Sequence, residues 1–497
     1  MDMAAPKVEL FPNDPIFTGL FKSRDCVSDV VISDEYGIEA DYEQIFEDIV
    51  SLRRLLRETL PARSFDDQGL LRPELGTIAS ITTSVYYFAI CFFSVASLGG
   101  KCRIDDNILI PESNPCLIML SSGTTGKPKG VVLPRRRIFY APWGGSKSVE
   151  LTYRPVHWIS SAIPPIKNLI WGNKTICLKR GAGPDDLWEV FRDRHVTTAA
   201  ITPIRLKAMQ EYYYSNIQSM SAEEHDSYVA GVSRLKQVIS AGSILHPDTA
   251  RFWKKLTNIS IITVYGTTEL ATRGFETSPD NPYRELCVGV TAKLSEGNKG
   301  QLFLKAPGMF THYIGDEEAT KNVFDEDGFY NTGDIVRRDG DEYFFLGRSS
   351  TDWIRFSAFT VSVVELEKRL LELPYVSEAY VLPIMDYEAR ELVAAVIRLK
   401  EPASAQGHSQ VNLAKVRNDL SSNTEPYKLP RLLRVLQEGE TIPLTVSEKA
   451  RKNEIREKYF KISGYRPRDY AVPGVEFYGN ETGSQFLADA KKLPLAA

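Results

Sequence analysis

Apolar and polar positions along the chain follow two patterns, one typical of helices and one typical of strands. In residues 42–60 the apolar side chains recur at helical spacing with charges on the opposite face, which predicts an amphipathic helix. Short β-branched runs alternate with helical patterns; the runs lie at residues 198–203, 235–240 and 259–265, and the helical patterns at 184–195, 203–215 and 247–256. This alternation indicates βαβ units around a mostly parallel sheet.

Beyond residue 300 the pattern changes to short alternating strands joined by turn residues, as in GQLFLKA, GFYNTGDIVRR and DEYFFLGR. A helix is predicted at 363–373, followed by strands at 377–385 and 391–399. The sequence therefore predicts an α/β protein with an α+β part. We expect a large N-terminal domain at 1–347, a small α+β domain at 348–470 and a loosely held tail at 471–497.

Residues 76–100 contain no charged side chain and are long enough to suit a membrane span. The first half, however, is rich in β-branched and hydroxyl residues, and the second half is a shorter apolar run that ends in two glycines. A buried strand, a turn and a buried helix fit this pattern at least as well. We therefore expect no membrane span.

The charge balance, the cysteines and the first residues of the sequence argue against several classes of protein. The chain has 60 Lys and Arg residues against 64 Asp and Glu residues, a formal net charge of -4, whereas nucleic-acid binders usually show a basic surplus. Six scattered cysteines with no CxxC pair indicate free thiols in a reducing compartment. The first residues show no basic segment followed by an apolar one. We expect a cytoplasmic protein with no nucleic-acid partner.

The segment SSGTTGKPKG at residues 121–130 carries the clearest chemistry. It follows a strand-like run, CLIML, and alternates glycines with small hydroxyl residues. Backbone N–H groups and hydroxyls of such a loop can surround phosphate oxygens, and two lysines add positive charge. An ordinary surface turn is the alternative interpretation. The residues expected to bind phosphate are Ser121, Ser122, Gly123, Thr124, Thr125, Gly126, Lys127 and Lys129, with Thr125 and Lys127 also expected to assist catalysis.

Together with four later motifs, this loop resembles the adenylate-forming superfamily of acyl-CoA synthetases, peptide-synthetase adenylation domains and luciferases. The later motifs are VYGTTEL at 264–270, YNTGD at 330–334, GRSSTDWIRFSAFTVSVVELE at 347–367 and PLTVSEKARK at 443–452. The resemblance implies an N-terminal domain of several subdomains, including a small β-barrel, and a mobile C-terminal domain. It also implies use of ATP, Mg²⁺ and coenzyme A on a small carboxylic acid.

The resemblance assigns nucleotide-binding roles to residues whose chemistry suits them. An aromatic ring at Tyr265 can stack on adenine, and the carboxylate of Glu269 is a hard oxygen ligand for Mg²⁺. A turn of this kind is usually structural when it stands alone. The other residues that the resemblance places at the nucleotide are Gly242, Ser243, Gly266, Thr267 and Thr268.

Four residues near or within the smaller domain complete the set implied by the resemblance. Asp334 would accept hydrogen bonds from the ribose hydroxyls, and Arg348 would support ribose and phosphates. Ser350 falls at the hinge, where the family usually has Asp or Lys. Lys449 would be the mobile catalytic cation that stabilises the transition state. Read alone, Asp334 could be a turn residue and Lys449 a solvated charge.

His157 and Trp158 fall where the family carries a gate beside the acyl pocket, although a His-Trp pair is more often part of a core. Three hypotheses about function remain. The first is formation of an acyl-adenylate and then a coenzyme A thioester. The second, motivated by Ala358 and Glu448 in place of usual glycines, is transfer to a carrier protein in trans or to an amine. The third is a catalytically impaired relative, because only 20 residues separate Gly100 from Ser121.

Overall fold

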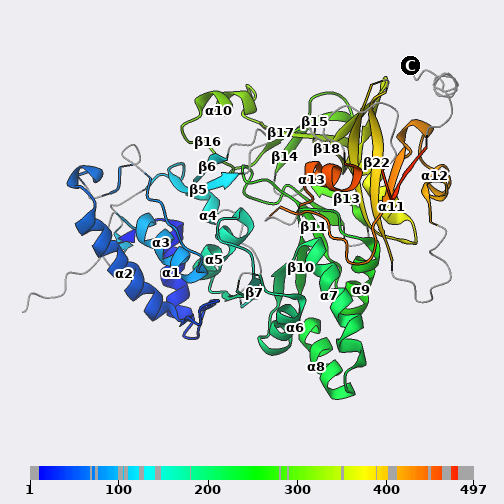
Figure 1. Ribbon diagram of the computed structural model, residues 1–497. Helices are drawn as coiled ribbons and strands as arrows, with labels where there is room; N and C mark the ends of the chain where they lie inside the picture. Colours follow the sequence, from blue (N-terminus) through cyan, green and yellow to red (C-terminus); the bar gives the residue numbers. More distant parts are fainter. Residues whose placement is uncertain are drawn as a thin grey trace, which may run out of the picture. The chain divides into compact units, whose positions relative to one another are not determined.

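Two units make up the computed structural model, and Figure 1 shows their helices and strands. The first unit takes in the described residues of 1–241, 249–292 and 304–330, and the second those of 242–248, 293–303 and 331–497. The structure describes residues 11–67, 70–72, 77–98, 104–105, 110–121, 128–139, 147–179, 181–278, 281–287, 290–348, 352–387, 389–400, 411–445, 449–461 and 472–478.

A mostly parallel sheet organises the first unit. Its strand order there is β13-β12-β11-β10-β9-β7-β8-β2-β3. Pairing is parallel from β11 to β2 and antiparallel at both ends, which confirms the predicted βαβ pattern. The strands are β2 Ile32–Ser33, β3 Glu39–Ala40, β7 Val149–Thr152, β8 Lys174–Cys177, β9 Thr198–Ala200, β10 Gln237–Ser240, β11 Ile262–Tyr265, β12 Phe275–Ser278 and β13 Asn281–Cys287.

The helices predicted between these strands are present, and several more accompany them. The helices are α1 Pro15–Cys26, α2 Tyr42–Thr59, α3 Val85–Ala96, α4 Arg136–Phe139, α5 Ile159–Trp171, α6 Pro184–Asp193, α7 Pro203–Ser215, α8 Ala222–Ser233, α9 Pro247–Thr257 and α10 Glu317–Val323. The predictions at α2, α6, α7 and α9 are confirmed. Helix α5 contains Pro164 and Pro165, and the sequence analysis made no prediction for this segment.

Two smaller sheets complete the first unit. One pairs β1 Phe11–Pro12 with β4 Ile104–Asp105, and the other has the order β16-β6-β5. The strands of the second sheet are β5 Pro115–Ser121, β6 Lys129–Pro134 and β16 His312–Tyr313. Because β5 and β6 are antiparallel with Ser121 opposite Lys129, the two ends of the expected phosphate loop lie next to each other.

The segment at residues 76–100 differs in part from its prediction. Its apolar half forms α3, with the Ser84 hydroxyl accepting a hydrogen bond from the Tyr87 N–H at 3.1 Å. The predicted strand before it is wrong, since the described residues 77–84 contain no strand. None of the described helices has the length and apolar character needed to cross a membrane.

Antiparallel strands dominate the second unit. In one sheet β14, β15, β17 and β18 are consecutive neighbours, and in the other the order is β20-β19-β22-β23-β24, with β21 paired to β22. The elements are β14 Thr291–Leu294, β15 Lys299–Lys305, β17 Tyr330–Asp339, β18 Glu342–Arg348, β19 Trp353–Phe356, β20 Phe359–Ser362, α11 Val363–Glu372, β21 Val376–Asp386, β22 Arg390–Leu399, α12 Leu413–Leu420, β23 Leu432–Val435, α13 Lys452–Ile455 and β24 Val475–Phe477.

Apolar faces of α11, α12 and strands β19 to β23 form the core of the second unit, including the fully buried Val361, Leu370 and Val396. The core confirms the α+β pattern predicted for this part of the chain. One expectation is wrong: β24 lies in the segment predicted to be a loose tail, yet it pairs with β23 through the register Leu432 to Phe477.

A buried ion pair links the start of the first unit to β6. The Asp14 carboxylate accepts hydrogen bonds from the N–H groups of Ile16 at 3.0 Å and Phe17 at 3.2 Å, so it caps α1. The same carboxylate accepts a bond from Arg135 Nε at 2.9 Å. Both side chains of the pair are buried. The pair therefore fixes α1 against the strand that carries Lys129.

We expect Asp14→Ala to lower the free energy of unfolding by about 3–5 kcal/mol, because it leaves the buried Arg135 guanidinium without its carboxylate and removes the cap of α1. Urea titration followed by tryptophan fluorescence measures the change. Asp25→Ala is the matched control, since Asp25 forms an exposed pair with Arg24 and should change stability by less than about 0.5 kcal/mol. Equal effects of the two substitutions would contradict the proposed importance of the buried pair.

Candidate active site

The turn after β11 brings the predicted adenine and metal residues together. A Cβ atom at Gly266 would lie 2.8 Å from the carbonyl oxygen of Thr272, so only glycine fits there. The Tyr265 ring packs edge-on against Phe275 at 5.8 Å between centroids. Ala271 has a φ of 52°, an unusual conformation for a residue other than glycine, and its N–H donates to the Thr267 carbonyl at 3.0 Å. The turn is therefore tightly constrained.

Tyr313 connects two of the predicted motifs. Its hydroxyl donates to Glu269 Oε1 at 3.0 Å, and Lys129 Nζ lies 4.8 Å from the centroid of its ring. The side chain is buried, and β16 holds it beside β6. The structure thus places Lys129 of the first motif and Glu269 of the second on the same tyrosine. Sequence reasoning missed Tyr313, because no local pattern distinguishes it from a core aromatic residue.

Several predicted phosphate-binding residues fall in a part of the chain that the structure does not describe. Ser121 ends β5 and Lys129 begins β6, so the described ends of the loop are placed by strand pairing. The predictions for Ser122, Gly123, Thr124, Thr125, Gly126 and Lys127 lie outside the described residues, as does the prediction for Ser350.

A cavity of about 140 Å³ opens in the first unit beside the Tyr265 turn. Tyr265, Gly266 and Thr267 form part of its wall, and Ala200 and Ala241 add residues from the carboxyl ends of β9 and β10. Ligands of open α/β sheets bind at such strand ends. The apolar wall includes Ile159, Ile163, Pro164, Ile239 and Val264, and the charged wall consists of Arg137, Glu150, Arg154, Lys167 and Arg273.

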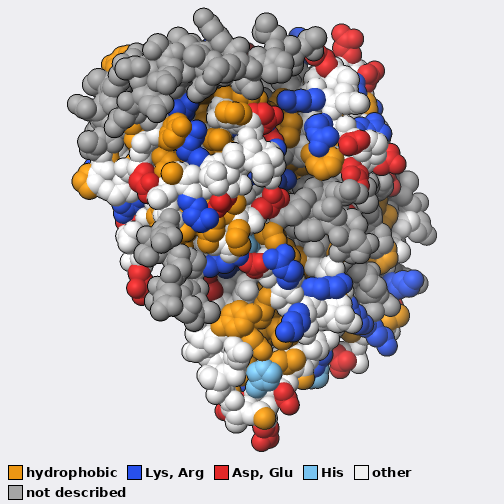
Figure 2. Space-filling model, turned by 90° about the vertical axis from the view of Figure 1, so that its right-hand side faces the viewer, with side chains coloured by type: hydrophobic (Ala, Val, Ile, Leu, Met, Phe, Trp, Pro, Cys, Tyr) orange, Lys and Arg blue, Asp and Glu red, His pale blue; other side chains and the backbone are white. Residues whose placement is uncertain are grey.

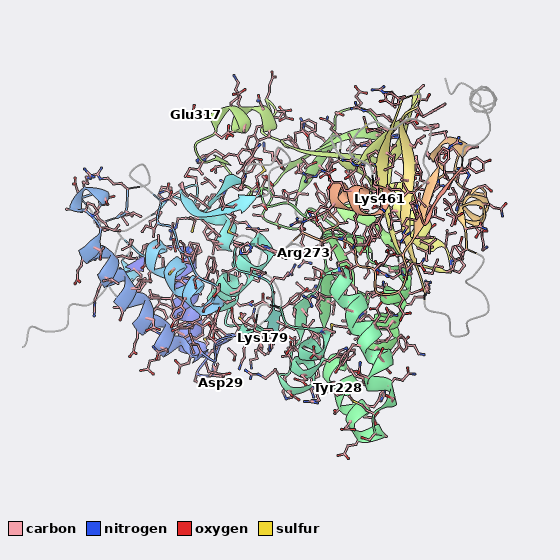
Figure 3. The ribbon with its side chains drawn as sticks, in the orientation of Figure 1. Asp29, Lys179, Tyr228, Arg273, Glu317 and Lys461 are labelled. Atoms are coloured by element: carbon pink, nitrogen blue, oxygen red, sulfur yellow. The ribbon has the colours of Figure 1, made fainter. Side chains whose placement is uncertain are left out.

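Three charged side chains of the cavity wall have pKa values that differ from their usual range. Burial, and then the neighbouring Arg137 charge, lower the pKa of Lys167 to about 7, and burial lowers the pKa of Arg137 to about 10. Burial also raises the pKa of Glu150, whose Oε2 accepts a hydrogen bond from Asn168 Nδ2 at 3.0 Å. Arg273, labelled in Figure 3, forms an ion pair with Glu276 at 3.2 Å. These residues were not predicted as part of the site.

His157 and Trp158 lie between the lining residues Arg154 and Ile159 in sequence, and neither belongs to the cavity wall. Trp158 stands at the N-cap of α5, and its ring contacts His157 edge-on at 6.2 Å. His157 is exposed and Trp158 is partly buried. The structure therefore places the pair at the beginning of the helix that carries Lys167.

The second unit brings Asp334 and Arg348 together as cross-strand partners. They lie opposite each other in β17 and β18, and Arg348 Nε is 3.2 Å from Asp334 Oδ1. Asp334 is buried, while Arg348 remains partly exposed. Gly347, with a φ of 120°, allows the close approach of Asp352, whose Oδ2 accepts from the Arg348 N–H at 3.0 Å. The two motif residues thus form one charged cluster.

Lys449 joins the same cluster from a loop more than a hundred residues along the chain. Its N–H donates to Thr445 Oγ1 at 3.1 Å and its carbonyl accepts from the Thr445 N–H at 2.8 Å, so the two residues are paired. Although the residue is exposed at the surface, surrounding protein desolvates the ammonium and lowers its pKa. The positive charge of Arg348 lowers this pKa further, whereas Asp334 and Asp352 oppose the change. Because charge interactions weaken with distance, these effects show that the Lys449 ammonium lies near Arg348, Asp334 and Asp352.

Gly242 and Ser243, predicted to form an adenine wall, directly follow the strand β10. Gly242 has a φ of 101° and an open space around its Cα, while Ser243 is exposed. Both belong to the second unit, whereas Ala241 before them belongs to the first. The chain therefore passes from one unit to the other at this motif.

Comparison with known proteins identifies relatives over most of the chain. A family model for AMP-binding enzymes matches residues 79–314. The acyl-CoA ligase oryP of Aspergillus oryzae is 28% identical over 518 residues, which cover 91% of this chain and 93% of that protein. A malonate–CoA ligase of Arabidopsis thaliana is 27% identical over 375 residues, 69% of this chain and 60% of that protein, so the match spans less than two thirds of that relative.

The fold agrees with these relatives. The crystal structure of ATP-bound MatB from Rhodopseudomonas palustris superposes with a TM-score of 0.66 at 19% identity and covers 90% of this chain and 98% of that one. The five motifs lie in order along a chain with this fold. The chain is thus similar to AMP-binding enzymes over residues 79–314 and to an acyl-CoA ligase over most of its length.

Proposed function

We propose that the protein uses ATP to convert a carboxylic acid into an acyl-adenylate and then into a coenzyme A thioester. The observation that carries this proposal is the cluster of Asp334, Arg348 and Lys449, which come from three separate motifs and whose charges influence one another. The names of the relatives, an acyl-CoA ligase and a malonate–CoA ligase, support the same chemistry.

In the first step an oxygen of the acid's carboxylate attacks the α-phosphate of ATP, the bond to the leaving pyrophosphate breaks, and an acyl-AMP forms. Two anions must approach each other, so cations near the reacting groups lower the barrier. Lys449 is suited to this role because it is an accessible cation. Asp334 is suited to the ribose hydroxyls because its carboxylate is fixed by Arg348.

Glu269 suits a magnesium ion held jointly with phosphates. Its carboxylate is partly exposed and is oriented by the Tyr313 hydroxyl. Among the described residues no three His, Cys, Asp or Glu side chains gather as a metal site, and Mg²⁺ commonly uses one or two carboxylates together with substrate phosphates. When bound, the ion would neutralise phosphate charge.

In the second step the coenzyme A thiol would attack the acyl carbonyl and AMP would leave. A carrier-protein thiol or an amine is the alternative acceptor, and analysis of products with and without coenzyme A distinguishes them. A domain boundary at residue 348, a hinge at Ser350, an acyl gate at His157 and Trp158, and a cytoplasmic location stay predictions. The scattered cysteines support the last of these.

We expect Lys449→Ala to reduce acid-dependent exchange of pyrophosphate into ATP by about 100- to 1,000-fold, because it removes the cation that stabilises the transition state. The same variant should convert a supplied acyl-AMP and coenzyme A into thioester at close to the normal rate. Lys415→Ala, at an exposed lysine of α12 paired with Asp419, is the control and should change neither rate. Equal loss of both steps would overturn the assignment of Lys449.

We expect Tyr313→Phe to weaken binding of Mg·ATP about tenfold, since the hydroxyl that orients Glu269 is lost while the ring beneath Lys129 remains. Titration calorimetry at several Mg²⁺ concentrations measures the effect. Tyr214→Phe removes an exposed hydroxyl on α7 and should leave binding unchanged. Unchanged affinity in Tyr313→Phe would show that the hydroxyl does not position the carboxylate.

A further inference from the structure

A short antiparallel hairpin in the second unit carries Lys449. Residues 443–445 form one side of it and residues 449–451 the other. The cross-strand pairs are Thr445 with Lys449, Leu444 with Ala450 and Pro443 with Arg451. The main chain at Lys449 is therefore held by the hairpin, and the place of the hairpin depends on what holds its two ends.

Two side chains of the helical turn at Arg456–Phe460 hold the residues that lead into the hairpin. Lys458 Nζ donates a hydrogen bond to the Thr441 carbonyl at 2.7 Å, and Tyr459 Oη donates to the same oxygen at 2.8 Å. Tyr459 is buried and belongs to the core of the second unit. The chain is therefore attached to the core two residues before the hairpin begins.

An ion pair holds the residue that leaves the hairpin. Lys452 directly follows the hairpin, and its Nζ lies 3.2 Å from Oε1 of Glu367 on α11. The same Oε1 accepts a hydrogen bond from the Val381 N–H of β21 at 2.9 Å. Because an extended chain spans at most about 10 Å over three residues, this pair anchors the main chain within about 10 Å of Lys449.

The carboxylate of this ion pair lies mostly inside the protein. Figure 2 shows one face of the molecule, where Lys and Arg side chains are interspersed with Asp and Glu side chains, and exposed pairs of this kind contribute little. The Glu367 side chain is only 14% exposed, whereas that of Lys452 is 30% exposed. Burial raises the pKa of Glu367, and the Lys452 charge opposes this effect. Because a buried carboxylate is costly without its partner, Glu367 keeps Lys452 in a defined place.

We propose that Glu367 is a positioning residue for adenylation, which acts through Lys452 to hold the hairpin where the Lys449 ammonium stabilises the transition state. This inference rests on the proposed function, which gives Lys449 its catalytic role. Loss of either member of the pair leaves Lys449 in the chain but releases the end of the hairpin next to it. Since a displacement of about 1 Å can slow a catalysed step about a hundredfold, the weakened anchor should slow the step that uses Lys449.

We expect Glu367→Gln and Lys452→Met each to lower kcat for acid-dependent pyrophosphate exchange about tenfold, with KM for ATP within about twofold of its normal value. Both variants should convert a supplied acyl-AMP and coenzyme A into thioester at close to the normal rate. Lys452→Arg keeps the positive charge and should retain most of the exchange rate. Arg369→Met is the matched control, because it breaks an ion pair of 2.6 Å with Glu365 on the same helix and should change neither step.

Combination with Lys449→Ala distinguishes positioning from a general loss of stability. If Glu367 acts through Lys449, then Glu367→Gln should not lower the residual exchange rate further once Lys449 is replaced by alanine. A further tenfold loss in that background, or an equal loss of the thioester step, would overturn the inference. An unchanged kcat in both Glu367→Gln and Lys452→Met would overturn it as well.

Hydrogen exchange followed by mass spectrometry gives a readout that does not depend on catalysis. The N–H groups of Thr445, Lys449 and Arg451 donate hydrogen bonds within the hairpin, so their exchange reports how firmly the hairpin is held. In a peptide spanning residues 443–452, Glu367→Gln should accelerate exchange about tenfold, whereas Arg369→Met should leave it unchanged.

The proposed function and the role of Glu367 can fail separately. If no acid supports pyrophosphate exchange in the unaltered protein, the proposed function is overturned; faster hydrogen exchange in Glu367→Gln would then still support the anchoring of the hairpin by this pair. Equal hydrogen exchange in the unaltered protein and in Glu367→Gln would overturn the role of Glu367, even where pyrophosphate exchange establishes adenylation.

Discussion

The parallel alignment of β7, β9, β10 and β11 is the constraint on which the site in the first unit depends. Parallel strands end at the same edge of a sheet, so residues that follow them are brought together whatever their separation in sequence. Arg154, Ala200, Ala241 and Tyr265 meet at one cavity for this reason. The apolar strands form a rigid support, and the residues that follow them line the cavity.

Sequence alone predicts those features of the fold and the site that depend on neighbouring residues in the chain, and it misses those that depend on tertiary contacts. The βαβ alternation and the five motifs are local patterns; the alternation was sufficient to predict the fold class, and the motifs pointed to Asp334 and Arg348, which the fold brings together. Tyr313 and Lys167 were missed because their roles come from tertiary contacts. A tyrosine in a short strand and a lysine in an apolar helix have no distinguishing spacing.

The errors have equally specific causes. The strand predicted before α3 is wrong because its last residue, Ser84, caps the helix instead; the Ser84 hydroxyl accepts from the Tyr87 N–H and donates to Asp34 at 2.7 Å. The predicted tail contains β24 because β23 offers a free edge, and strand pairing depends on a distant partner more than on composition. In both places a tertiary interaction decides the local structure.

The two units share one electrostatic arrangement, although each holds its own residues. In the first, Arg137 lies close enough to Lys167 to lower its pKa, and in the second, Arg348 does the same to Lys449. Placing like charges together costs stability, and proteins retain such conflicts mainly at functional sites. In the second unit, Asp334 and Asp352 already offset part of this repulsion. Positive charges held close together suit the binding of anionic substrates, as the proposed joining of a carboxylate to a nucleotide requires.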